Sequence, residues 1–257
     1  MPTPEKQAAA PPPVRASRRG IAIRAATLAI GVGAVALLVL SGPGTRSGWW
    51  SWGIGLTMFM AAGVVGIVVA LVALVLLAIG LLPSRRARPW VPLAALALAL
   101  VAIAPALVFF LEASHVPSIH DITTDTQDPP AFAALLAARN ASPNGAAYGG
   151  PKVADAQRAA YPDVKPLVVA TPPRETMQRA IDAARAMGWE IVASDAASGR
   201  IEATAHTRWF GFADDVVVRI RPQGAGSRVD VRSASRVGQS DVGANAERIR
   251  RFLGRLA

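Results

Sequence analysis

Three long apolar runs dominate the first 111 residues of the chain, at residues 21–40, 54–82 and 91–111. Each reaches the roughly 20 residues that an α-helix needs to cross the hydrocarbon of a bilayer. The second and third runs contain no charge, and the first contains only Arg24, close enough to its start to extend to the interface. The pattern predicts a transmembrane region of three helices over residues 21–111, with the lipid bilayer as its partner.

A cleavable signal peptide is the alternative for the first run. Its apolar core is longer than the 7 to 15 residues of a typical signal, and Leu38–Ser41 is a poor match to the small-residue pattern of a cleavage site. We therefore expect a retained helix. Because intramembrane charges usually mark ion or proton paths, the uncharged spans favour an anchor over a small-solute permease.

Positive charge is concentrated beside these runs. Residues 1–111 hold nine Lys and Arg against one acid, whereas residues 112–257 hold eighteen against sixteen. The surplus therefore indicates membrane orientation and not a nucleic-acid partner. Basic residues cluster before the first run and in the second loop, whereas the first loop contains only Arg46. This distribution predicts a cytoplasmic tail over 1–20 and an extracytoplasmic C-terminus. The clustered residues are Lys6, Arg15, Arg18, Arg19, Arg85, Arg86 and Arg88.

The remainder predicts a linker with short helices over 112–166 and an α+β domain over 167–257. Apolar periodicity predicts one helix from Thr171 to Gly188 and a last helix starting near Ser240 or Asp241. Alternation predicts strands at 167–170, 189–193, 200–208, 215–221 and 228–236. Short turns between the last four favour an antiparallel sheet with both helices on one face, an order similar to the helix-grip class.

Arginine is abundant on the sheet positions that alternate with the apolar ones, with seven arginines against three acids. One interpretation is an anion-binding surface, since the guanidinium fork matches phosphate or carboxylate. The other is a solvated face of cross-strand ion pairs, which we favour. The candidate ligand-binding residues lie in and beside the last strand and at the start of the last helix: Arg219, Arg232, Ser235, Arg236, Asp241 and Asn245.

Catalytic candidates are few. His120 with Asp121 or Asp125 could serve a hydrolase or lyase, and Asp214 and Asp215 could form an acid–base pair, although neighbours on a strand point to opposite faces. The spacing of the acids near His120 matches no metal-binding loop, so we expect no metal. The chain has no cysteine and no phosphate-cradling glycine loop, and we expect no cofactor.

Five strings carry a resemblance to a known family: Ile119–Asp125, Pro129–Phe132, Tyr161–Asp163, Gly211–Asp215 and the long stretch Val229–Ile249. Together they resemble the family called domain of unknown function 1499, over roughly residues 115–256. The resemblance implies the fold unit and a place in a bacterial envelope, often behind membrane helices, and it implies no activity.

These observations lead to one functional expectation. The chain is expected to be a multi-pass protein of the bacterial inner membrane that presents a non-catalytic domain on the envelope side. That domain would bind an anionic ligand or envelope proteins. The hydrolase or lyase based on His120 is the alternative.

Overall fold

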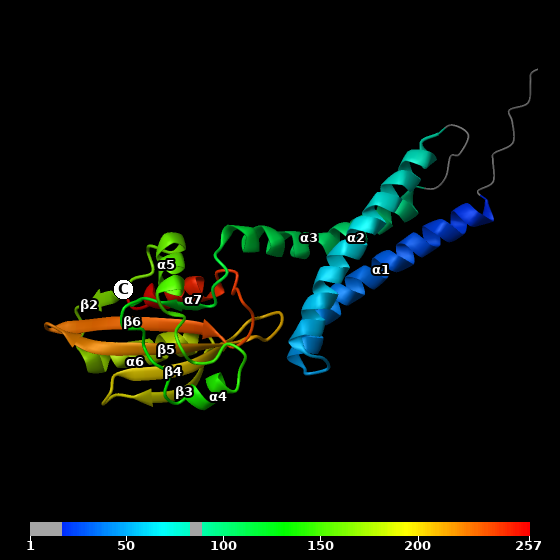
Figure 1. Cartoon of the computed structure of the whole chain (residues 1–257). Helices are drawn as coiled ribbons and strands as arrows, with labels where there is room; N and C mark the ends of the chain where they lie inside the picture. The colour runs from blue at the N-terminus through cyan, green and yellow to red at the C-terminus, as the bar shows by residue number, and fades with distance from the viewer. Residues whose placement is uncertain (1–16, 83–88) are drawn as a thin grey trace, which may run out of the picture. The chain divides into compact units, whose positions relative to one another are not determined.

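The computed structural model describes residues 17–82 and 89–257, and it contains three helices long and apolar enough to cross a membrane. These are α1 (Arg18–Arg46), α2 (Trp52–Gly80) and α3 (Trp90–His115) (Figure 1). They confirm the three helices that the apolar runs predict. α1 and α3 extend beyond their runs at both ends, whereas α2 begins and ends two residues earlier than its run. The basic residues Lys6, Arg15, Arg85, Arg86 and Arg88 and most of the 1–20 tail lie outside the described residues.

Small residues bring α2 and α3 close together. A Cβ atom added at Gly66 would lie 3.0 Å from the carbonyl oxygen of Ala99 and 3.2 Å from the Cβ atom of Ala102. Ala95 and Ala99 are fully buried beside Ala73. Close approach of this kind is how apolar helices associate in lipid, where burial of apolar surface gives no drive.

The C-terminal unit is a six-stranded antiparallel sheet with helices. Its strands run in the order β1-β6-β5-β4-β3, and β2 pairs with β6 beside β1. The elements are β1 (Asp121–Thr123), α4 (Leu136–Asn140), α5 (Gly150–Ala160), β2 (Leu167–Val169), α6 (Pro173–Ala186), β3 (Glu190–Asp195), β4 (Arg200–His206), β5 (Ala213–Gln223), β6 (Gly226–Ser235) and α7 (Ala244–Leu253). The antiparallel α+β fold predicted from the sequence is therefore confirmed.

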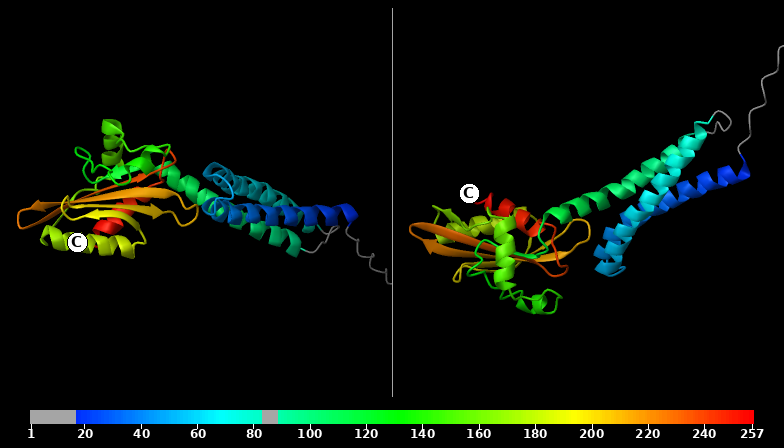
Figure 2. Two further views of the ribbon diagram at one scale, coloured as in Figure 1. Left: turned by 90° about the horizontal axis from the view of Figure 1, so that it is seen from below. Right: turned by 45° about the horizontal axis from the view of Figure 1, so that its top comes forward.

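The helices α6 and α7 cover the same face of the sheet, and Val153 and Ala156 of α5 pack against the same core (Figure 2). Val216, Val218 and Ile220 alternate on β5 and point into this layer, as strand geometry requires. Phe252 of α7 is fully buried and stacks on Trp189 with ring centroids 4.9 Å apart. The main apolar core therefore lies between the sheet and the two helices.

The segment expected to be a linker, residues 112–166, does contain the short helices α4 and α5, but it also supplies β1. Asp121–Thr123 pair with Arg232–Ala234 of β6. The following residues lie against the second face of the sheet, where Phe132 and Leu135 pack on Val217 and Ala234. This segment is thus an integral layer of the domain.

The expectation of a solvated second face is accordingly wrong. Glu202, Asp215, Asp230 and Arg232 are all at most 3% exposed. The segment after β1 covers the polar positions of the alternating strands. This burial is possible because each of these charges is paired or hydrogen-bonded inside the domain, as a buried charge requires.

The two main helices begin slightly later than expected. α6 starts at Pro173, after Pro172, and α7 starts at Ala244. Gly243 precedes α7 with φ +79°, a left-handed conformation that suits glycine. Asp241 nevertheless caps this end, because its carboxylate accepts hydrogen bonds from the backbone N–H groups of Gly243 (2.9 Å) and Asn245 (2.8 Å).

Candidate functional site

Arg232 forms a buried ion pair with Asp121 on the second face of the sheet. Its guanidinium donates to both carboxylate oxygens of Asp121, at 2.9 and 2.7 Å, and also to the carbonyl oxygens of Pro130 and Ala146. The ring of Phe132 lies 4.9 Å from the guanidinium carbon. Since β1 and β6 are adjacent, this pair ties the start of the domain to its last strand.

Arg236 and Arg139 share a second carboxylate, that of Asp215. Arg236 donates to both of its oxygens at 2.9 and 2.8 Å, which raises the pKa of Arg236 above its ordinary value. Arg139 is 1% exposed and reaches Asp215 at 3.5 Å. Removal from water lowers the pKa of Arg139, and the negative charge of Asp215 offsets part of this effect.

Three further arginines gather around the buried carboxylate of Asp230. Arg219 and Arg221 approach it at 3.1 and 2.8 Å, and Arg228 at 3.0 Å. The same three guanidinium groups reach Asp125 or Asp128 in the segment after β1: Arg219 at 3.0 Å and Arg221 at 3.3 Å from Asp128, and Arg228 at 2.8 Å from Asp125. This cluster holds that segment onto β5 and β6.

Ser235, Asn245 and Asp241 lie on the helix-covered face. Asn245 donates to the carbonyl oxygen of His120 and to the hydroxyl of Ser235, both at 3.0 Å, and accepts from Ser233 at 2.6 Å. Burial raises the pKa of Asp241 above its ordinary value, although its two backbone hydrogen bonds oppose the shift. The six candidate ligand residues are therefore divided between two faces of the sheet and are used in internal contacts.

The catalytic alternative is also divided. Asp121 is held by Arg232, and Asp125 accepts from Arg228 and from the backbone N–H groups of Gln127 and Asp128. Asp215 and Asp214 face opposite sides of β5, as predicted: Asp215 binds Arg236, and Asp214 binds Arg248 of α7 at 2.5 Å. Within residues 17–82 and 89–257, no group of three His, Asp or Glu side chains could hold a metal ion.

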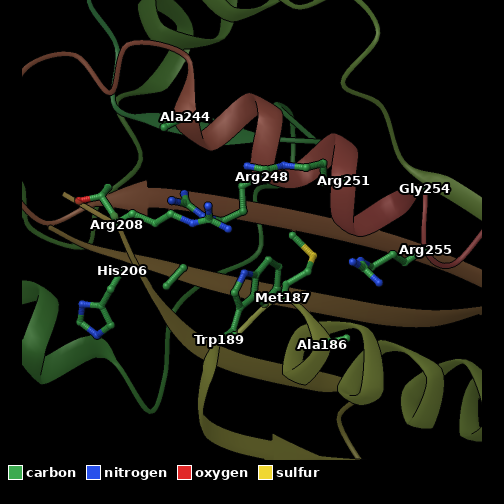
Figure 3. Close-up of a pocket in the computed structure, with 13 residues that line it drawn as sticks. Ala186, Met187, Trp189, His206, Arg208, Ala244, Arg248, Arg251, Gly254 and Arg255 are labelled. Atoms are coloured by element: carbon green, nitrogen blue, oxygen red, sulfur yellow. The ribbon is translucent and has the colours of Figure 1, made fainter. Parts of the chain in front are cut away.

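A different part of the domain forms an open pocket of about 920 Å³. It lies where the end of α6, the start of β3 and the end of β4 meet α7 (Figure 3). Trp189, Met187 and Ala205 give it an apolar wall. The lining also contains one histidine and four arginines, and no acid is among the lining residues. These basic residues are His206, Arg208, Arg248, Arg251 and Arg255.

The charges of this pocket are only partly balanced. Arg248 is paired with Asp214, and Arg251 contacts Glu247 at 3.4 Å. In the part of the chain that the structure describes, neither Arg208 nor Arg255 has a carboxylate within 4.0 Å. About two positive charges thus remain beside an apolar wall.

The sequence pattern predicted a ligand site in and beside β6 and did not predict this pocket. Arg248, Arg251 and Arg255 stand three and seven residues apart, a spacing that places them on one side of a helix and that reads as an ordinary exposed face. Arg208 follows the end of β4, more than 35 residues earlier in the chain. Only the packing of α7 against that end of the sheet brings the four together.

Comparison with known proteins adds one match. Residues 121–256, more than half of the chain, match a family described as "Protein of unknown function (DUF1499)". No curated protein matches the chain. The matched range begins at β1 and ends just after α7, and so it contains every strand of the sheet, the segment that covers its second face and the arginine-lined pocket. The chain belongs to the DUF1499 family, with three potential membrane-spanning helices ahead of the family domain.

Proposed function

We propose that this protein is a membrane-anchored binding protein, whose DUF1499 domain holds an anionic ligand in the pocket beside α7 and carries out no catalysis. One observation carries the proposal: four arginines line that pocket together with an apolar wall, and the lining contains no acid. Pockets of roughly 300 to 1,000 Å³ with a few convergent polar groups are typical of small-molecule sites.

The arginines of the sheet are less suitable for a ligand. Arg219, Arg232 and Arg236 each contact an aspartate of the domain at 3.1 Å or less. An incoming anion would have to compete with these carboxylates for the same guanidinium groups, and two of the carboxylates are fully buried. We therefore assign these residues, with Ser235, Asp241 and Asn245, to the stability of the domain.

The proposed location follows from the membrane helices and the charges between them. Three crossings with a basic N-terminus and a basic second loop would leave the N-terminus in the cytoplasm and the DUF1499 domain on the other side of the membrane. With the family resemblance to envelope proteins, this supports the inner membrane of a bacterium, where an anionic ligand or an envelope protein would meet the domain.

Anion titrations of the full chain in detergent micelles test the proposal. The probes are inorganic phosphate and glycerol phosphate, and binding is measured by isothermal calorimetry. We expect the double variant Arg208→Ala/Arg255→Ala to weaken binding at least tenfold. The matched control, Arg174→Ala/Arg185→Ala, removes two exposed arginines of α6 outside the pocket and should change binding less than twofold.

Binding that is the same in the wild type and in the Arg208/Arg255 variant would overturn the proposal, because the anion would then lie elsewhere. Circular dichroism of each variant at the temperature of the titration shows that the chain is folded.

A further inference from the structure

We propose that the ligand is an amphiphile, a phosphate monoester carried on an apolar body, and not a free or sugar-linked phosphate. This inference rests on the proposed function, since it specifies what the same pocket binds. It depends on three features of the pocket: a fixed apolar wall, an excess of about two positive charges, and the arrangement of those charges around the wall.

The wall combines a ring that is held in place, that of Trp189, with the adaptable side chain of Met187. Trp189 is 6% exposed and stacks on the fully buried Phe252, so its ring is held in place. Ala205 lies beside it at the end of β4, and Met187 ends α6. Figure 3 shows Met187 and Trp189 between α7 and the end of α6. A methionine adapts its shape to an apolar partner, which suits a flexible chain better than a polar sugar.

The excess charge matches a phosphate monoester. Arg208 and Arg255 lack a carboxylate partner among the described residues, whereas Arg248 and Arg251 are already paired. A phosphate monoester carries between −1.5 and −2 charges near pH 7 and offers three acceptor oxygens, whereas a carboxylate carries only one charge. Arginine also binds phosphate in a planar, two-pronged geometry.

The arginines surround the wall from different elements. Arg208 follows β4, whereas Arg251 and Arg255 come from the last turns of α7 and the residues after it. A ligand whose apolar body lies on Met187 and Trp189 would therefore have its charged group within the basic rim. An anion without such a body would leave the partly exposed side chain of Met187 in water and would gain nothing from the apolar wall.

The test compares three probes that share the phosphate group and differ in the body attached to it. Inorganic phosphate has none, glycerol phosphate has a polar body, and hexyl phosphate has an apolar one. We expect hexyl phosphate to bind the full chain in micelles at least tenfold more tightly than either of the others. The Arg208→Ala/Arg255→Ala variant in the same micelles corrects for partition of the probe into detergent.

A substitution in the wall separates the contribution of the apolar body from that of the charge. Met187→Ser should weaken hexyl phosphate binding at least fivefold and leave inorganic phosphate binding within twofold. Met187→Leu, which keeps an apolar side chain, should bind hexyl phosphate as tightly as the wild type does. The control is Val168→Ser, which removes an exposed apolar side chain of β2 outside the pocket and should have no effect.

The outcomes distinguish the two proposals. If the three phosphates bind equally and all depend on Arg208 and Arg255, the pocket binds anions and the amphiphile inference is wrong. If glycerol phosphate binds most tightly, the ligand is a polar phosphate and the inference is again wrong. If none of the probes depends on the two arginines, the proposed function itself fails.

Discussion

Single residues on the second face of the sheet show how charged side chains can be buried. Arg232 has four hydrogen bonds to Asp121, Pro130 and Ala146, and its guanidinium lies over the rings of Phe132 and Tyr148. Burial also raises the pKa of Tyr148 to about 12. Four of the five N–H groups of the arginine donate hydrogen bonds, and such pairing is the condition under which a buried charge is tolerated.

Removing this arginine should therefore cost far more than removing an exposed one. We expect Arg232→Ala to lower the free energy of unfolding by about 3–5 kcal/mol, because Asp121 would remain buried without its partner. Chemical denaturation of the full chain in micelles measures the change. Arg185→Ala, which breaks an exposed pair with Asp182, should cost less than about 1 kcal/mol. Equal effects would contradict the structural role of Arg232.

Asp241 should make stability depend on pH in the direction opposite to most aspartates. Burial raises its pKa in the folded chain, so the folded state binds its proton more tightly than the unfolded state. The stability that this group contributes is then largest at low pH and falls as the pH rises from its unfolded pKa, about 3.9, through the raised value.

Asp241→Asn removes this titration and keeps a side chain that caps helices well. We expect the melting temperature of the variant, minus that of the wild type, to increase between pH 4 and pH 7. Asp163→Asn is the matched control, because its contact with Arg250 lowers the pKa of Asp163. The wild type gains stability from Asp163 as the pH rises towards 4, because the folded chain favours its ionised form. The melting temperature of Asp163→Asn minus that of the wild type should therefore decrease over that range. A constant difference for Asp241→Asn would contradict the argument.

At the scale of elements, glycine positions reveal how closely the strands approach. Gly199 and Gly224 both have positive φ, +63° and +58°. An added Cβ atom at Gly199 would lie 2.1 Å from the carbonyl oxygen of Ile220, whereas at Gly224 nothing lies within 4 Å. The two positions share the backbone strain and differ only in the collision.

Alanine at these two glycines should therefore have unequal effects. Gly224→Ala carries only the left-handed strain, about 1–2 kcal/mol. Gly199→Ala adds a backbone collision that β4 and β5 must separate to relieve, and we expect it to lower the free energy of unfolding by at least about 1 kcal/mol more. Thermal unfolding of both variants in the same detergent measures the difference. Similar losses would show that the turn at Gly199 adapts.

The sequence predicted most elements of the fold and little of the site, for identifiable reasons. Long periodic stretches such as α6 and the alternating strands β4 to β6 carry strong local signals. β1 has only three residues, and its partner on β6 lies more than 100 residues away, so no local pattern could reveal it. The buried charges were interpreted as solvated because alternation shows which side is polar and does not show whether another segment covers that side.

At the scale of the whole molecule, three potential membrane-spanning helices precede a family domain that contains every strand. The proposed topology predicts opposite locations for the two ends of the chain. Alkaline phosphatase fused after Ala257 should be active, and the same enzyme fused within the second loop should be inactive, since it folds only outside the cytoplasm. Activity of the loop fusion with inactivity of the C-terminal fusion would reverse the orientation.

Strand β6 also determines when the domain can form. It pairs with β1, β2 and β5, so two strands made early have no partner until residues 226–235 have been synthesised. During translation, Asp121 and the apolar segment around Phe132 must wait for more than 90 further residues before Arg232 is available. A ribosome that stops before Gly226 would therefore leave an anchored chain whose first strands stay open to chaperones and proteases.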